Sequence, residues 1–197
     1  MADKYIEIIS IGNEILSGLT TNTNAAFIAR MMAGINIRTG WISTISDQPE
    51  EIIHALVQAG KRADIIIATG GLGPTPDDLT KKALATFFKT ELVLHQETLN
   101  RIRHIFEGRG MIMPDTNKSQ AMLPASAKII PNKFGTAPGL EFRQDDRVYF
   151  FLPGVPHEMK SLISDYVLDS VKHIYFPQAS QASTLTVANR LSQSGIL

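Results

Sequence analysis

Apolar runs alternate with amphipathic segments through the first half of the chain. The runs at Tyr5–Ile11, Ile35–Ser46 and Ile65–Thr69 predict three strands. Apolar side chains recur at helical spacing between and after these runs, which predicts three helices: Asn22 to about Gly34, Pro49 to about Gly60, and about Asp77 to Phe88. Strands that alternate with helices imply right-handed crossovers and a largely parallel sheet. The pattern therefore predicts an α/β fold.

The second half of the chain has a less regular pattern. It predicts two longer helices, a short helix, a short strand and a hairpin: Gln96–Gly108, about His157–Lys172, Thr116–Met122, Lys128–Ile130, and Leu140–Arg143 with Arg147–Leu152. We expect one domain over residues 1–174. Residues 175–197 are rich in Ser, Ala and Gln, so we expect a linker or the start of a following domain there.

A glycine-rich turn follows the strand predicted at Ile65–Thr69, with the sequence Gly70-Gly71-Leu72-Gly73-Pro74-Thr75-Pro76-Asp77-Asp78. Glycines at the end of a strand let backbone N–H groups approach a ligand closely. The start of the next helix adds partial positive charge, which favours an anion such as phosphate. We therefore expect four residues of this turn to bind phosphate: Gly70, Gly71, Gly73 and Thr75.

The paired carboxylates Asp77 and Asp78 would repel a phosphate at this turn. A divalent cation (Mg²⁺, Mn²⁺ or Co²⁺) would remove the conflict by bridging carboxylate and phosphate oxygens. The alternative is ordinary helix-start chemistry, with Thr75 as N-cap, Pro76 at N1 and acidic residues in the first turn. That alternative does not explain three glycines, so we expect Asp77 and Asp78 to be catalytic and metal-binding.

Two more loops are expected beside the glycine turn, because ligands bind beyond the carboxyl ends of parallel strands. Together the three loops offer the polar residues Glu14, Asn22, Asn24, Asp47, Asp77 and Asp78. Glu14 is a further catalytic candidate, as a general base, and Asp47 is a further metal ligand. The turns Gly135–Gly139 and Leu152–Pro156 are either ordinary turns or sites for a flat ring or phosphate. Candidates for substrate recognition are Asn24, Thr136, Gly154 and Glu158.

The amino-acid composition limits the kinds of molecule that the protein is expected to bind. Nineteen basic and nineteen acidic residues give a formal net charge of zero, which argues against binding nucleic acid through excess positive charge. The basic cluster Arg101, Arg103, His104 and Arg109 is interpreted as a solvated helix face. The absence of cysteine excludes disulfides and thiolate chemistry within this chain. With no signal-like segment or membrane-length apolar run, we expect a soluble cytoplasmic protein, without membrane contact and dimeric by default.

Several motifs occur together in a specific order. They are Gly12-x-Glu14-x-Leu16-x-Gly18, Asn22-Thr23-Asn24, the turn from Gly70 to Thr80, Asn117-x-x-Gln120-Ala121, Gly135–Gly139, and Leu152-Pro153-Gly154-Val155-Pro156-x-Glu158-Met159. In combination, from Tyr5 to Val171, the chain resembles the CinA family (competence/damage-inducible protein A). One position departs from the family pattern, because Ser119 stands where a basic residue is common before Gln120-Ala121.

The resemblance implies a three-layer α/β/α fold with a largely parallel sheet, like the molybdopterin-binding domains of molybdenum-cofactor biosynthesis proteins. It also implies divalent-metal-dependent ADP-ribose pyrophosphatase activity, which agrees with the metal and phosphate expected at Asp77 and Asp78. Full CinA proteins carry a further amidohydrolase domain, for which 197 residues are too few.

Three functions follow as hypotheses. The first is metal-dependent hydrolysis of the pyrophosphate bond of ADP-ribose or a similar nucleotide. The second is a protein of molybdenum-cofactor metabolism that binds or adenylylates a molybdopterin-type substrate. The third is a non-catalytic nucleotide-binding module linked to competence or DNA damage.

Overall fold

The computed structural model describes residues 5–73 and 79–176. Within them a six-stranded sheet has the order β2-β1-β3-β8-β7-β6. Its strands are β1 (Ile6–Ile11), β2 (Thr39–Ile45), β3 (Ile65–Thr69), β6 (Lys128–Ile130), β7 (Gly139–Gln144) and β8 (Arg147–Leu152). The four strands β2, β1, β3 and β8 are parallel, whereas β7 runs antiparallel to both β8 and β6. The prediction of a largely parallel sheet is confirmed.

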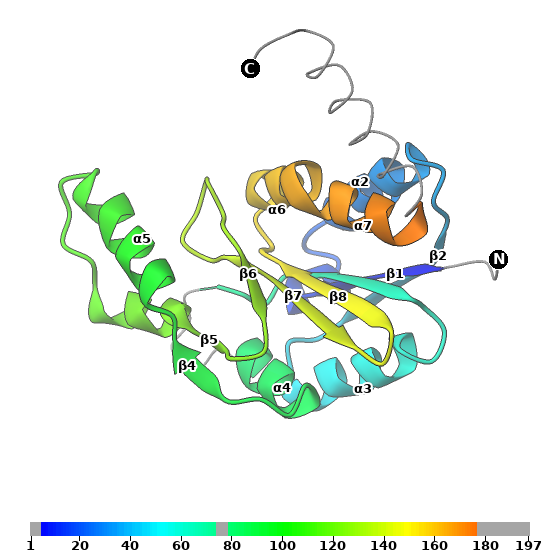
Figure 1. Ribbon diagram of the computed structural model, residues 1–197, viewed down its shortest axis with the longest axis horizontal. Helices are drawn as coiled ribbons and strands as arrows, with labels where there is room; N and C mark the ends of the chain where they lie inside the picture. The colour runs from blue at the N-terminus through cyan, green and yellow to red at the C-terminus, as the bar shows by residue number, and fades with distance from the viewer. Residues whose placement is uncertain (1–4, 74–78, 177–197) are drawn as a thin grey trace, which may run out of the picture.

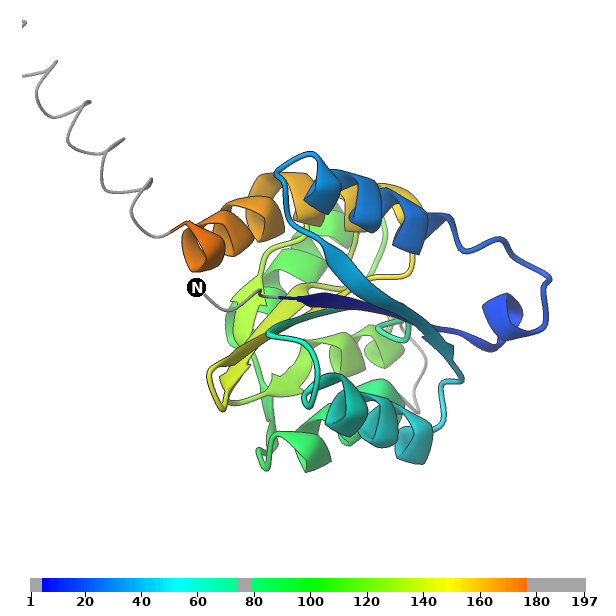
Figure 2. The same ribbon diagram turned by 90° about the vertical axis from the view of Figure 1, so that its right-hand side faces the viewer.

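Helices cover both faces of this sheet (Figures 1 and 2). One face carries α2 (Thr23–Ala33), α6 (Pro156–Leu162) and α7 (Leu168–Tyr175), and the other carries α3 (Pro49–Ala59) and α4 (Leu79–Phe87). Each pair of layers encloses its own hydrophobic core. The three-layer α/β/α architecture expected from the resemblance is therefore present.

The central strands are apolar because both of their faces are covered. Every residue of β1 and of β3 is buried, and most of these residues are apolar, as expected for strands covered on both faces. The polar exceptions are Glu7, Ser10 and Thr69. A side-chain cap and a proline fix where helices α2 and α3 begin. The Asn22 side chain accepts a hydrogen bond from the backbone N–H of Ala25 at 3.2 Å, and Pro49 stands at the first turn of α3. The predictions of these two helix starts are confirmed.

Three predicted elements differ from the structure: one in where it begins, one in its helix type and one in its continuity. Strand β2 begins at Thr39 rather than Ile35, because the chain after α2 first makes a turn in which Asn36 has φ 58°. The short predicted helix is a 3₁₀ helix, η1 (Asp115–Ala121). The predicted helix His157–Lys172 is interrupted between α6 and α7 by a π-helical turn, η2 (Ile163–Val167).

A second, two-stranded sheet lies beyond the β6 side of the main one (Figure 1). It pairs β4 (Leu92–Leu94) with β5 (Met122–Pro124) antiparallel, next to α5 (Gln96–Glu107). Helix α5 agrees closely with its prediction, but neither strand was predicted. Three residues are too few to show an alternating pattern, and the strands meet only through their long-range pairing.

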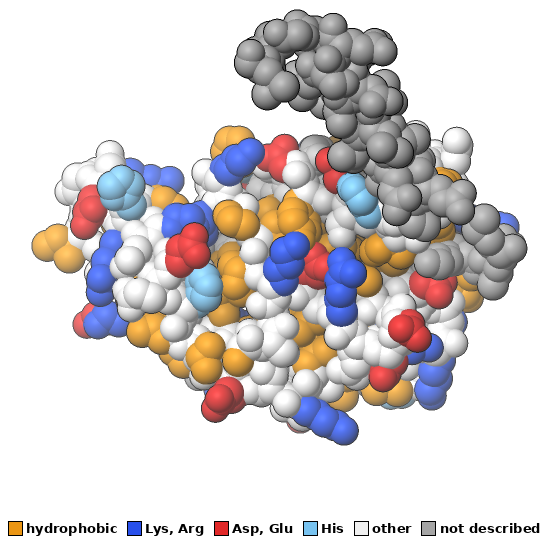
Figure 3. Space-filling view, viewed as in Figure 1, with side chains coloured by type: hydrophobic (Ala, Val, Ile, Leu, Met, Phe, Trp, Pro, Cys, Tyr) orange, Lys and Arg blue, Asp and Glu red, His pale blue; other side chains and the backbone are white. Residues whose placement is uncertain are grey.

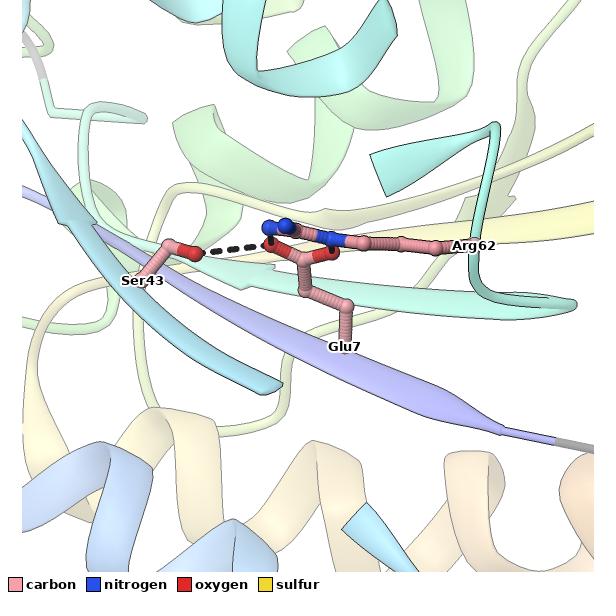
Figure 4. Close-up of polar contacts among 3 residues, drawn as sticks. All are labelled: Glu7, Ser43 and Arg62. Atoms are coloured by element: carbon pink, nitrogen blue, oxygen red, sulfur yellow. Dashed lines mark hydrogen bonds and ion pairs between the residues drawn. The ribbon is translucent and has the colours of Figure 1, made fainter. Parts of the chain in front are cut away.

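A buried ion pair joins β1 to the edge strand β2 and to the turn after α3 (Figure 4). The carboxylate of Glu7 is 1% exposed and accepts hydrogen bonds from Arg62 Nε (2.8 Å), Arg62 Nη2 (2.7 Å) and Ser43 Oγ (2.7 Å). The guanidinium also lies 5.1 Å from the ring centroid of Trp41. Glu7 stands within an apolar run, so the sequence pattern gave no sign of this pairing.

Replacing Arg62 with Gln is expected to lower the free energy of unfolding. The change would leave the Glu7 charge buried without its cation, which costs about 3–5 kcal/mol for a fully buried pair. Because the Arg62 side chain is 39% exposed, we expect a smaller loss of about 2 kcal/mol, measured by chemical denaturation. The exposed Arg103→Gln is the matched control and should change stability by less than about 0.5 kcal/mol. An equal effect of both substitutions would contradict a stabilising pair.

Candidate functional site

A cleft of about 120 Å³ opens at the carboxyl ends of the central strands. It is lined by the ends of β1 and β3, the short helix α1 (Asn13–Leu16), the start of α2 and the turn after β8: Ile11, Glu14, Ile15, Thr20, Thr21, Asn22, Thr23, Asn24, Thr69, Gly70, Gly154 and Pro156. Strand β1 has β2 on one side and β3 on the other, so successive crossovers leave in opposite directions here. Ligands of open α/β sheets bind at such a switch point.

Two glycines allow the strand ends to converge at this cleft. Gly70 has φ 107°, and a Cβ atom there would overlap the carbonyl oxygen of Ile11. Its N–H donates to the Leu152 carbonyl at 3.1 Å, and a Cβ on Gly154 would lie 3.3 Å from Gly70 Cα. The ends of β1, β3 and β8 therefore meet through backbone atoms, which a ligand can approach closely.

Asn24 connects α2 to two of these strand ends. Its Nδ2 donates to the Gly154 carbonyl at 2.8 Å and to Thr69 Oγ1 at 3.2 Å, and the Thr69 hydroxyl donates to the Pro153 carbonyl at 3.0 Å. Asn24 Oδ1 is buried and receives no hydrogen bond within the part of the chain that the structure describes. A buried acceptor without a donor is costly, so a ligand N–H or O–H group would stabilise this arrangement.

Asn22 lines the same cleft, but its hydrogen bonds hold the protein together. Its Oδ1 accepts from Ser10 Oγ at 3.1 Å as well as from the start of α2, and its Nδ2 donates to Thr44 Oγ1 at 3.4 Å. Asn22 therefore ties β1, β2 and α2 together beneath the cleft.

Two predicted acidic residues lie at this end of the sheet. Glu14 lines the cleft from α1, and its carboxylate folds back against the backbone of Gly12. Asp47, between β2 and α3, accepts a hydrogen bond from Asn13 Nδ2 at 2.7 Å and is not among the residues that line the cleft. No three His, Asp or Glu side chains among residues 5–73 and 79–176 form a group that could hold a metal ion. The described side chains alone thus do not fit a divalent cation.

The glycine-rich turn is described only up to Gly73. Gly71 is exposed with φ 73°, close to the Thr80 hydroxyl, and Gly73 is exposed in open space. Neither is among the residues that line the cleft. The remaining predicted site residues of this turn, Thr75, Asp77 and Asp78, lie outside the described residues, so their roles stay predictions.

Thr136 and Glu158 belong to a second cluster around the loop before β7. Asn132 Nδ2 donates to Glu158 Oε2 at 2.6 Å, and Arg101 donates to the carbonyl groups of Asn132, Gly135 (3.0 Å) and Thr136 (3.1 Å). Burial lowers the pKa of the Arg101 guanidinium, and the negative charge of Glu158 opposes that shift. The structure does not place Thr136 or Glu158 among the residues that line the cleft.

The interpretation of Arg101 as part of a solvated helix face is wrong. Its guanidinium is partly buried and holds the loop, whereas Arg103, His104 and Arg109 are exposed as expected. No sequence signal identified Arg101, because the carbonyl groups that it binds lie more than 30 residues further along the chain.

A larger hollow of about 450 Å³ lies between the two-stranded sheet and β6. Its walls are mostly apolar, from Val93, Leu123, Pro124, Ala127, Ile129, Pro131 and Pro138, and Arg101 reaches it from α5. The guanidinium is already engaged with three backbone carbonyls. The cleft at the strand ends, smaller but at the switch point of the sheet, is the better candidate site.

Gly70→Ala is expected to destabilise the protein by about 2–4 kcal/mol, because the new methyl group would meet the Ile11 carbonyl in a backbone conformation that favours glycine. The matched control is Gly73→Ala, where a Cβ atom meets nothing within 4 Å and the change should be below about 0.5 kcal/mol. Thermal and urea unfolding of both variants measure the difference. Equal stabilities would mean that the strand ends are not packed as described.

No helix in the described ranges combines the length and apolar character needed to span a bilayer.

Residues 7–173 match the family described as a probable molybdopterin binding domain. A CinA-like protein from Cytophaga hutchinsonii is 46% identical over 169 residues, 86% of this chain and 40% of that protein. One from Dictyoglomus thermophilum is 43% identical over 162 residues, 82% of this chain and 39% of that protein. The chain thus spans about 40% of the length of these relatives.

Solved structures agree with these matches. CinA from Thermoplasma acidophilum superposes with a TM-score of 0.76 at 34% identity, covering 84% of this chain and 97% of that one. The tungsten cofactor synthesizing protein MoaB from Pyrococcus furiosus gives a TM-score of 0.55 at 18% identity, over 88% of this chain and 98% of that one, which shows the fold alone. The identity to relatives, the family match and the superposition on a solved structure agree. The chain therefore belongs to the CinA family, with a domain of the molybdopterin-binding type over residues 7–173.

Proposed function

We propose that this domain binds a phosphorylated heterocyclic small molecule of the molybdopterin class in the cleft formed by Asn24, Gly70 and Gly154. The observation that carries the proposal is the buried Asn24 Oδ1, which receives no donor from the described residues at the carboxyl ends of three strands. A ring N–H or a hydroxyl group of such a ligand would supply that donor. The membership of the probable molybdopterin binding domain family supports the same class of ligand.

The charge of the cleft bears on how a phosphate would be held. Among the described residues that line it, Glu14 is the acidic one and none is Lys or Arg. A phosphate here would depend on backbone N–H groups near the turn that begins at Gly70, as in other glycine-rich strand–helix turns. The cleft has room for one ring or one phosphate group, so the rest of the ligand would extend over the surface.

Asn24→Ala is expected to weaken ligand binding about 10-fold, because it removes the buried acceptor and the amide that holds Gly154 and Thr69. Isothermal titration with molybdopterin, ADP-ribose and ATP, each under anaerobic conditions, measures the effect. Asn100→Ala on the exposed side of α5 is the matched control and should bind like the unchanged protein. If all three probes bind both variants equally, the ligand does not occupy this cleft.

The second candidate function is metal-dependent hydrolysis of ADP-ribose to AMP and ribose 5-phosphate. The observation that favours it is Glu14, a carboxylate that lines the cleft in which the anionic substrate would bind. A divalent cation (Mg²⁺, Mn²⁺ or Co²⁺) would offset this charge and polarise the pyrophosphate. Because the described side chains do not form a metal site, the ligands would have to include Asp77 and Asp78.

Asp77→Asn is expected to reduce this hydrolysis at least about 100-fold, if Asp77 holds the metal or activates the attacking water. Release of AMP would be followed with each of the three metals and with EDTA. Asp169→Asn, an exposed carboxylate on α7, controls for a general loss of charge. Turnover that survives Asp77→Asn or EDTA would exclude this role. Binding of ADP-ribose without turnover in the unchanged protein would instead favour a non-catalytic nucleotide-binding module.

A further inference from the structure

The hollow of about 450 Å³ between α5, the two-stranded sheet and β6 is separate from the cleft at the strand ends. None of the described residues that line the hollow also lines the cleft. In Figure 3, acidic, basic and histidine side chains lie beside apolar ones on the surface between α5 and β6. Small-molecule sites are typically pockets of about 300–1,000 Å³ with apolar walls and a few fixed polar groups. The hollow has the size and the lining of such a site.

Arg101 brings two unused hydrogen-bond donors to the hollow. A guanidinium has five N–H groups. The two on Nη1 donate to the carbonyl groups of Asn132 and Gly135, and one on Nη2 donates to the Thr136 carbonyl at 3.1 Å. The N–H of Nε and the second N–H of Nη2 have no acceptor among the described residues. Nε and Nη2 lie on one edge of the guanidinium, which can bind a carboxylate through two parallel hydrogen bonds.

His95 offers a third donor from the start of α5. Its Nδ1 accepts a hydrogen bond from the backbone N–H of Thr98 at 3.2 Å, so the neutral ring carries its proton on Nε2. In the part of the chain that the structure describes, this Nε2 has no partner. Because three carbonyl groups hold the guanidinium and the helix start holds the imidazole, both groups are in place before a ligand binds, which lowers the entropic cost of binding.

The charges around the hollow are of both signs. Glu97 is the acidic residue among the described residues that line it, four positions before Arg101 on α5. Side chains of opposite charge at this spacing commonly form an ion pair on a helix surface. Here the guanidinium bonds the loop carbonyls instead. Burial lowers the pKa of Arg101 although the charge of Glu158 opposes the shift, and a bound anion would compensate for the lost hydration. The hollow thus presents a cation and an anion side by side over apolar walls.

We propose that the hollow binds a free α-amino acid with an apolar side chain. Its carboxylate accepts hydrogen bonds from Arg101 and His95, and its ammonium group lies beside Glu97. Its side chain packs on the apolar wall formed by Val93, Leu123 and Ile129. A phosphate ester fits less well, because its second negative charge would be repelled by Glu97. A peptide fits less well too, because its two terminal charges lie at opposite ends of the molecule.

Calorimetric titration with L-phenylalanine and two truncated analogues tests the two charges separately. 2-Phenylethylamine lacks the carboxylate and is expected to bind at least about 10-fold more weakly than L-phenylalanine. 3-Phenylpropanoate lacks the ammonium group and is expected to bind about 5-fold more weakly, a smaller loss because Glu97 is exposed and water screens its charge. Equal affinities for the three compounds, or no binding of L-phenylalanine at millimolar concentration, would overturn the proposal.

Substitution of Glu97 shows whether the ammonium group lies where we propose. Glu97→Gln is expected to weaken binding of L-phenylalanine about 5-fold and to leave 3-phenylpropanoate unaffected, because that analogue has no group for Glu97 to attract. Glu107→Gln, an exposed carboxylate at the other end of α5, is the matched control and should change neither affinity. If Glu97→Gln weakens both compounds equally, the ammonium group does not contact Glu97 and the proposal is wrong.

Filling the hollow locates the site without touching any charged residue. Ala125 is exposed and lines the hollow, so Ala125→Trp is expected to abolish binding of L-phenylalanine. The neighbouring Ser126 is also exposed but does not line the hollow, and Ser126→Trp should bind like the unchanged protein. Both variants should keep the melting temperature of the unchanged protein, because both side chains are exposed. Binding of L-phenylalanine that survives Ala125→Trp would place the amino acid elsewhere and contradict the proposal.

Discussion

The close approach of three strand ends is the constraint on which the candidate site depends. Gly70 carries no side chain, so the backbone of β3 can pass against the Ile11 carbonyl of β1, and Gly154 lets the turn after β8 approach the same point. Asn24 then bonds to the ends of β3 and β8 from the neighbouring helix. The result is a cleft whose polar surface comes mainly from the backbone and from short neutral side chains. Recognition in this cleft would therefore rest on shape and hydrogen bonding more than on charge.

Much of the fold could be predicted from the chain alone, because its main determinants are local. Strand β3 appears as a nearly continuous apolar run, and strand β1 is apolar except for Glu7 and Ser10. Asn22 and Pro49 mark the helix starts. The features that could not be predicted depend on residues far apart in sequence. Arg62 pairs with Glu7 across 55 residues, and β4 and β5 are each too short to show a period. Neither the Arg62–Glu7 pair nor the pairing of β4 with β5 produces a recognisable pattern in the local sequence.

The residues of the candidate site also fall into those that could be predicted from the sequence and those that could not. Glu14, Asn24, Gly70 and Gly154 follow or flank parallel strands, and the topology alone brings such positions to one edge of the sheet. Thr136 precedes the antiparallel strand β7, and its carbonyl is held by Arg101, a side chain for which the sequence gave no functional signal. The roles of Asp77 and Asp78 remain predictions, and with them the choice between a binding domain and a metal-dependent hydrolase.

Mapping of the ligand by amide NMR is the most direct measurement of the central claim. In a titration of isotope-labelled protein with ADP-ribose and with molybdopterin, the backbone signals of Gly70 and Gly154 and the side-chain amide of Asn24 should shift together and saturate at one concentration. Shifts confined to the hollow beside Arg101, with those three signals unchanged, would show that the strand-end cleft is not where the ligand binds.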